Sequence, residues 1–242
     1  MKKVLASIIF LWMTLLFAHG PNHNLAEEAK KRGDFKSALR YSLKQLQEDF
    51  KLYGEYANET MITYGRLGIY SEKLGQYDEA LSYNEEALKI QAKLLSKNDA
   101  TIATTYNNIG GIYSKQGKYK KALDYYFKSL KMQEILFGKQ HRSSAITYNN
   151  IAKVYNKQKK YQEALRYYQK SLTIREETLE KNHYTIALAH SKIGLVYYKL
   201  GQYKNALYEL DITLKIRKEV FGEKHSFTKK TKKNIAYIKS KM

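Results

Sequence analysis

The feature that most constrains the fold of this chain is an internal repeat of 42 residues. Each copy carries an aromatic residue, an alanine three residues later and a leucine directly after it. These positions are Phe35, Tyr77, Tyr119, Tyr161 and Tyr203, with Ala38, Ala80, Ala122, Ala164 and Ala206. Self-similarity at a fixed period of about 20–50 residues indicates an architecture in which each unit buries its apolar face against its neighbours.

The best-formed copy predicts two helices, at about 103–116 and about 119–137. Tyr106, Ile109, Gly110 and Tyr113 recur at steps of three and four residues, which is typical of one helical face. Gly117 follows, and glycine readily adopts the left-handed conformation that ends a helix. The only proline is Pro21, so little else in the chain interrupts helix formation. We therefore expect an all-α fold.

A short polar link joins each copy to the next. Four residues share one register in these links: Asp99, His141, His183 and His225. A residue that alternates between aspartate and histidine where a helix begins is expected to be an N-cap, because its side chain accepts a hydrogen bond from the free amides of the first turn.

The repeat resembles the tetratricopeptide repeat in its 42-residue, kinesin-light-chain-like form. The likeness is carried by Tyr106-Asn107-Asn108-Ile109-Gly110 and Gly117 to Tyr126, and again by Tyr148 to Tyr168. It implies a right-handed α-solenoid of about five helix–turn–helix pairs over residues 21–242. The expected repeats are about 22–57, 61–99, 103–141, 145–183 and 187–225, with a capping helix at about 228–241.

Some positions depart from the repeat. Lys159 stands where the other copies have Gly33, Gly75, Gly117 and Gly201. The last segment has a first helix but no second one, which is typical of a terminal cap with one solvated side. We expect it to cover the last pair through Ile235, Ala236 and Ile238, over an apolar edge around Ile193 and Tyr197.

The first twenty residues have the pattern of a secretory signal. Lys2 and Lys3 precede an uncharged apolar run from Val4 to Ala18, and this run is short for a spanning helix. Cleavage is expected after Gly20, or after Ala18 because Pro21 would hinder the first site. The protein is then secreted or periplasmic; the alternative is a membrane tether formed by an uncleaved segment.

Composition bears on the class of function. The formal net charge is +20, which favours acidic partners, although a lysine-rich composition alone also explains it. Cysteine is absent, and no phosphate loop, serine elbow or metal motif is present. The link histidines form a row rather than a cluster, and His190 takes a packing position. We expect no enzyme, no cofactor and no metal site.

Two columns on the first helices are candidates for binding an extended protein segment. The resemblance implies that the first helices line the concave groove of the solenoid. The asparagine column comprises Asn107, Asn108, Asn149 and Asn150, and the lysine column comprises Lys73, Lys115, Lys157 and Lys199. Asparagine amides both donate and accept hydrogen bonds, so they suit a peptide backbone. The lysines favour an acidic segment.

Other interpretations of these columns remain open. Both columns are also consistent with solvated positions that repeated by duplication, and the chain would then be an architectural subunit or spacer that uses its ends or convex face. Nucleic-acid or anionic-surface binding is less favoured, because lysine is dispersed around the helices and export from the cytoplasm is expected.

Overall fold

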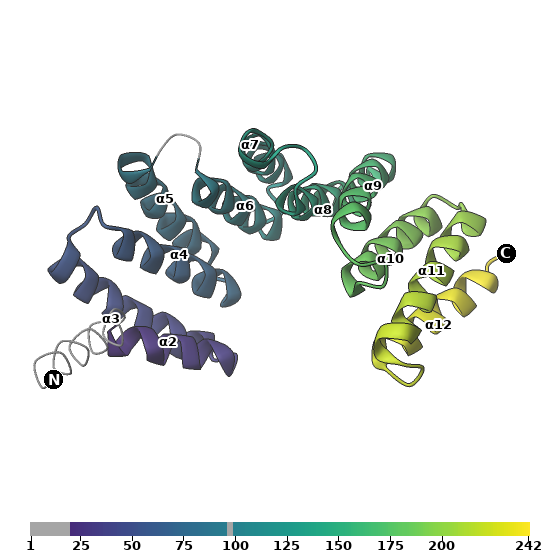
Figure 1. Cartoon of the computed structure of the whole chain (residues 1–242), viewed down its shortest axis with the longest axis horizontal. Helices are drawn as coiled ribbons and strands as arrows, with labels where there is room; N and C mark the ends of the chain where they lie inside the picture. Colours follow the sequence, from purple (N-terminus) through teal and green to yellow (C-terminus); the bar gives the residue numbers. More distant parts are fainter. Residues whose placement is uncertain (1–19, 96–98) are drawn as a thin grey trace, which may run out of the picture. The chain divides into compact units, whose positions relative to one another are not determined.

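The structure, a computed structural model, describes residues 20–95 and 99–242. The predicted signal segment falls almost entirely in residues 1–19, outside this part. The described residues form eleven helices and no strand. Figure 1 shows the helices in order along the chain. This confirms the predicted all-α solenoid.

The helices come in five pairs, followed by α12 (Ser226–Lys239). The first helices of the pairs are α2 (Pro21–Lys31), α4 (Asn58–Lys73), α6 (Ala100–Lys115), α8 (Arg142–Lys157) and α10 (Tyr184–Lys199). The second helices are α3 (Phe35–Tyr53), α5 (Tyr77–Leu94), α7 (Tyr119–Phe137), α9 (Tyr161–Thr178) and α11 (Tyr203–Phe221).

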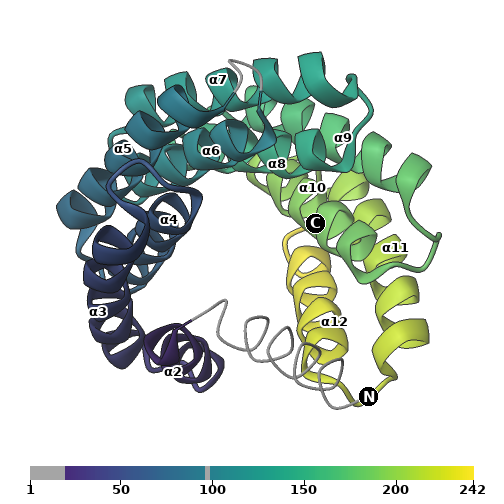
Figure 2. The ribbon, with the colours of Figure 1, turned by 60° about the vertical axis from the view of Figure 1, so that its left-hand side comes forward.

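The chain forms two compact units, Met1–Ile112 and Tyr113–Met242, whose boundary falls within α6. In the first unit, α3 packs between α2 and α4, and α4 also packs against α5. In the second unit, α8, α9, α10 and α11 pack in sequence, and α12 lies against α11 (Figure 2). Ile151, Val154, Ile193 and Val196 are almost fully buried in the core of this second unit.

A small residue in each first helix allows close contact with the second helix of the pair. A β-carbon added to Gly194 would lie 3.1 Å from the carbonyl oxygen of Ala206 and 3.1 Å from Cγ of Leu210. In the first unit, a β-carbon on Gly68 would overlap the side chain of Asn84. Glycine at this register therefore sets the distance between the paired helices.

The link residues are N-caps, as the sequence predicts. Asp99 Oδ1 accepts from the Thr101 amide at 2.7 Å. His141, His183 and His225 accept through Nδ1 from the amide two residues on, at 3.2, 3.3 and 3.2 Å. Because the helix begins directly after its cap, α4, α6, α8 and α10 start at residues 58, 100, 142 and 184. These starts lie three residues before the predicted ones, which were placed on the repeated pattern further along each helix.

The terminal helix α12 is held by fewer residues than predicted. Ile235 and Ile238 are buried against Ala206 and Leu210 of α11, with Tyr197 at the edge of this cluster. Ala236 is exposed, so its predicted covering role is wrong. Ile193 belongs to the larger core cluster instead. The surface that α12 covers is thus mainly the side of α11 that carries Ala206 and Leu210.

Replacing Lys159 with glycine should stabilise the chain. Lys159 has φ of +60° and is the one described non-glycine residue with positive φ, whereas Gly75, Gly117 and Gly201 have φ of +73° to +79°. Side-chain-bearing residues pay roughly 1 kcal/mol in this region, so Lys159→Gly should raise the unfolding free energy by about that amount. Chemical unfolding measures it, with Gly201→Ala as the matched change in the opposite direction. A lower midpoint for Lys159→Gly would contradict the expectation.

Candidate peptide-binding surface

The first helices present one face made of polar and apolar side chains in alternation. Residues spaced four and then three apart lie on the same side of a helix. In the second unit this face, called here the first-helix face, comprises Ile146, Asn150 and Lys153 on α8 and Leu188, Lys192 and Leu195 on α10. Ile146 is 53% exposed, Leu188 40% and Leu195 38%. Large apolar side chains are therefore left open to solvent beside polar groups.

Lys192 lies deepest on this face. Its Nζ donates to Asn149 Oδ1 at 2.6 Å and lies 5.8 Å from the ring centre of Tyr168. Burial, together with the nearby charges of Lys153 and Arg175, lowers the pKa of Lys192 to about 8. Within residues 20–95 and 99–242, no carboxylate contacts its ammonium group.

Arg175 is a second cation near Lys192. It lacks the hydrogen bond to a threonine that the equivalent residues of the other repeats make. Elsewhere a polar residue of the second helix bonds a threonine of the following first helix. The pairs are Asp49 with Thr63, Gln91 with Thr105, Gln133 with Thr147 and Arg217 with Thr231. The threonine register holds Ala189 opposite Arg175, and Arg175 Nε donates to Ser171 Oγ of its own helix at 3.2 Å. Burial lowers the pKa of Arg175.

The chemistry of this region suits an anion. Two partly buried cations, Lys192 and Arg175, lie near the exposed Lys153 without a carboxylate partner in the described part of the chain. Such charges are electrostatically costly when unpaired, and a carboxylate from outside would offset that cost.

His190 is a core residue, as predicted from its packing position. It is buried, and its Nδ1 lies 2.7 Å from Glu209 Oε2 while its Nε2 lies 3.5 Å from Glu176 Oε1. The imidazole therefore ties α10 to both α9 and α11. Its ring nitrogens are already occupied within the chain.

The asparagine column lies half-buried on the first helices α6 and α8. Asn107 and Asn108 belong to α6, and Asn149 and Asn150 to α8, where Asn149 Nδ2 donates to Asn150 Oδ1 at 3.4 Å. Asn149 Oδ1 is occupied by Lys192. Part of the hydrogen-bonding capacity assigned to a ligand is therefore used between neighbouring first helices.

The lysine column has contacts within the chain. Lys73, Lys115, Lys157 and Lys199 are exposed. Lys73, Lys157 and Lys199 lie 6.0, 5.9 and 5.4 Å from the rings of Phe35, Tyr119 and Tyr161. Lys157 Nζ also donates to the Ser114 carbonyl at 3.1 Å, and Lys199 Nζ to Asn156 Oδ1 at 3.2 Å. These three lysines link successive repeats; binding of an acidic ligand by the column stays a prediction.

Residues 20–95 and 99–242 contain no group of three or more metal-ligating side chains. None of the helices described there is long and apolar enough to cross a membrane.

Comparison with known families matches most of the chain. Models of the tetratricopeptide repeat match residues 19–93, 101–183 and 188–226. The chain belongs to the tetratricopeptide repeat family. Members of this family generally serve protein–protein interaction or scaffolding and are generally not catalytic. No curated protein matches the sequence.

Solved tetratricopeptide structures share the fold. BtubC (BKLC) from P. vanneervenii is 25% identical, with a TM-score of 0.72 over 82% of this chain and 79% of that one. A putative kinesin light chain of Podosopora anserina, with nearly identical TPR-like repeats, is 19% identical, with a TM-score of 0.69 over 83% and 95%. MamA is 18% identical, with a TM-score of 0.56 over 81% and 95%. The kinesin-light-chain-like character of the repeats is thus confirmed.

Lys192 and Arg175 were not among the binding residues predicted from the sequence. Lys192 lies 42 residues after Asn150, so extending the asparagine register by one repeat would have found it. The loss of the threonine partner of Arg175 is also visible in the sequence, because Ala189 stands in the register that holds threonine in the other repeats. Burial lowers the pKa of both side chains, and a single sequence does not show which side chains are buried.

Proposed function

We propose that this chain is a non-enzymatic module that binds an extended, acidic segment of a partner protein along its first helices. The setting proposed is the cell envelope or the secreted space, which rests on the signal-like pattern of residues 1–20. The observation that carries the proposal is Lys192, a largely buried ammonium group that no carboxylate contacts in the described part.

The first-helix face defines what the segment should look like. An acidic side chain would meet Lys192 and Lys153. Apolar side chains on either side of it would meet Ile146, Leu188 and Leu195, which are exposed. The ligand is therefore an acidic residue flanked by large apolar ones. Burial of these apolar contacts would supply affinity, and the charge would supply selectivity.

The asparagines have a supporting role in this proposal. Asn107, Asn108, Asn149 and Asn150 would hold the peptide backbone, which requires no particular ligand sequence. Lys73, Lys115, Lys157 and Lys199 would add long-range attraction. Exposed charges are individually weak and are screened by salt, so this part of the affinity should fall as salt rises.

Fluorescence anisotropy with designed peptides tests the proposal. The probe is a labelled extended peptide with one glutamate between two leucines, and its match carries glutamine in place of glutamate. The chain should bind the glutamate peptide at least tenfold more tightly, and Lys192→Gln should remove this preference. Lys215→Gln on α11, an exposed lysine, is the control and should leave it unchanged.

Two results would contradict the proposal. Equal affinity for both peptides would show that the chain does not recognise the negative charge of the glutamate. An unchanged preference in Lys192→Gln would move recognition away from the first-helix face and would favour the spacer interpretation.

A further inference from the structure

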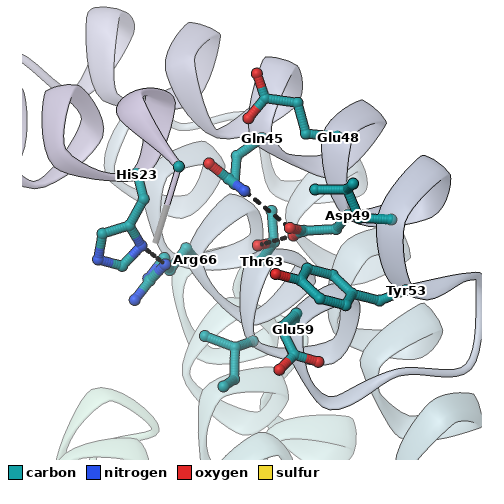
Figure 3. Close-up of a pocket in the computed structure, with 11 residues that line it drawn as sticks. His23, Gln45, Glu48, Asp49, Tyr53, Glu59, Thr63 and Arg66 are labelled. Carbon is teal, nitrogen blue, oxygen red and sulfur yellow. Dashed lines mark hydrogen bonds between the residues drawn. The ribbon is translucent and has the colours of Figure 1, made fainter. Parts of the chain in front are cut away.

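A cavity in the first unit has the opposite character to the surface around Lys192. It has a volume of about 170 Å³ and is bordered by α2, α3 and α4 (Figure 3). Three carboxylates line it: Glu48, Asp49 and Glu59. Local negative charge of this kind is unusual in a chain whose formal net charge is +20.

Asp49 is a buried carboxylate with neutral partners. It is 2% exposed. It accepts hydrogen bonds from Gln45 Nε2 at 2.8 Å and from Thr63 Oγ1 at 2.6 Å, and Figure 3 shows both contacts. The same register holds Gln91 and Gln133 in the next two second helices. The first pair thus buries a negative charge where those helices bury a neutral amide.

Gln45 presents an unused acceptor to this cavity. Its side chain is 7% exposed, and its Oε1 atom accepts no hydrogen bond within the described residues. The amide orientation is fixed because Nε2 donates to Asp49. A buried carbonyl oxygen without a donor is unfavourable, so a donor group that entered the cavity would be stabilised there.

Gln45 and Glu48 converge on one point beside Gly20. A β-carbon placed on Gly20 would lie 3.0 Å from Glu48 Oε2 and 3.3 Å from Gln45 Oε1. Asn22 Nδ2 donates to Glu48 Oε1 at 2.6 Å and so orients the carboxylate. Both acceptors therefore approach the same part of the cavity lining, next to the Gly20 backbone.

Arg66, the guanidinium that borders the cavity, has other partners. Arg66 Nη1 contacts His23 Nδ1, and Arg66 Nε lies 3.8 Å from Glu27 Oε1. In Figure 3, His23 and Arg66 lie together on the side of the cavity away from Glu48 and Asp49. Leu52, Tyr53 and Ile62 supply the apolar part of the wall.

We propose that this cavity binds a primary ammonium group on an alkyl chain, of the kind a lysine side chain carries. The ammonium would donate to Glu48 Oε2 and Gln45 Oε1, and the alkyl chain would contact Leu52, Tyr53 and Ile62. Two sources offer this chemistry: a lysine of a partner protein, or the chain's own amino group if the chain is cleaved directly before Gly20, which leaves a primary amine. The site is independent of the acidic-segment function proposed above.

Calorimetric titration of the full chain with n-butylammonium tests the site, with n-butanol as the uncharged match. Butylammonium should bind and butanol should not. Glu48→Gln should weaken binding at least tenfold, whereas Glu28→Gln, an exposed carboxylate on α2, should not. Gly20→Ala keeps every charge and fills the point between the two acceptors, so it should also abolish binding. Thermal unfolding of each variant shows that the fold is kept.

A chain that begins at Gly20, with a free or an acetylated amino group, separates the two sources. Binding of butylammonium to the acetylated form alone would identify the chain's own amino group as the occupant. Binding to both forms, together with binding of N-acetyl-lysine methylamide, would identify a partner's lysine. Absence of binding to the full chain and to the acetylated form would overturn the proposal. Unchanged binding in Glu48→Gln and Gly20→Ala would overturn it as well.

Discussion

Removal of α12 should produce the largest loss of stability of any change considered for this chain. Deleting residues 226–242 removes Ile235 and Ile238, which are buried, and uncovers Ala206 and Leu210, which are fully buried. Full burial of one large aliphatic side chain is worth about 1.5–3 kcal/mol. The loss should therefore be about 5 kcal/mol in unfolding free energy.

The deletion should also change the association state. The uncovered side of α11 carries Leu207, Leu210 and Leu214, which contact the cluster under α12. Terminal repeats with a polar outer face keep solenoids soluble, and such an apolar edge favours self-association. Circular dichroism should show a melting temperature lower by roughly 10 °C or more, and size-exclusion chromatography should show larger species.

A charge-neutralised α12 is the control for this deletion. Lys229, Lys230 and Lys233 are exposed, so changing them to glutamine should leave the melting temperature and the monomer unchanged. A truncated chain that remained monomeric and equally stable would show that α12 is not the cap of the solenoid. In that case its basic outer surface would become the reason for its presence.

The repeat register predicts the fold well because the same packing is specified five times. The glycine at Gly68 and Gly194 and the alanine at Ala80 and Ala206 each recur in register, and the structure uses them as close helix contacts. The caps at His141 and His183 were predicted for the same reason. A cap or a close helix contact that recurs at a fixed interval can be recognised in the sequence without knowing which residues are neighbours in space.

The site residues were harder to predict because they are exceptions to the repeat. Lys192 replaces asparagine, Ala189 replaces the threonine opposite Arg175, and Asp49 replaces glutamine in the first pair. A single sequence shows each substitution, yet it does not show that the new charge is buried or lacks a partner. The lysine column does repeat, and Lys157 and Lys199 also bond within the chain; ligand binding by this column stays a prediction.

Lys192→Asn should make the chain more stable near neutral pH. Asparagine occupies this register in α6, α8 and α12, at Asn108, Asn150 and Asn234. The pKa of Lys192 is about 8 in the folded chain, against an ordinary value of 10.5. The difference corresponds to at most about 3 kcal/mol of destabilisation by the buried charge. The variant should recover about 1–3 kcal/mol at pH 7.

The pH dependence distinguishes this cause from a change in packing. Below pH 8, Lys192 is charged in both states, and the folded chain bears the whole cost of burial. Between pH 8 and 10.5 the folded chain releases the proton first, so the native protein gains stability relative to Lys192→Asn; above 10.5 the gain is complete. Urea unfolding of both proteins at pH 7, 9 and 10.5 measures this difference, and Lys215→Asn is the exposed-lysine control.

The result bears directly on why a costly charge lies on the first-helix face. If Lys192→Asn is more stable and also loses its preference for the glutamate peptide, then the ammonium group is kept for binding at the expense of stability. If the variant is less stable at pH 7, the contacts of Lys192 with Asn149 and Tyr168 outweigh its burial. The lysine would then be a structural link between α8, α9 and α10, and its position on this face would no longer argue for an acidic ligand.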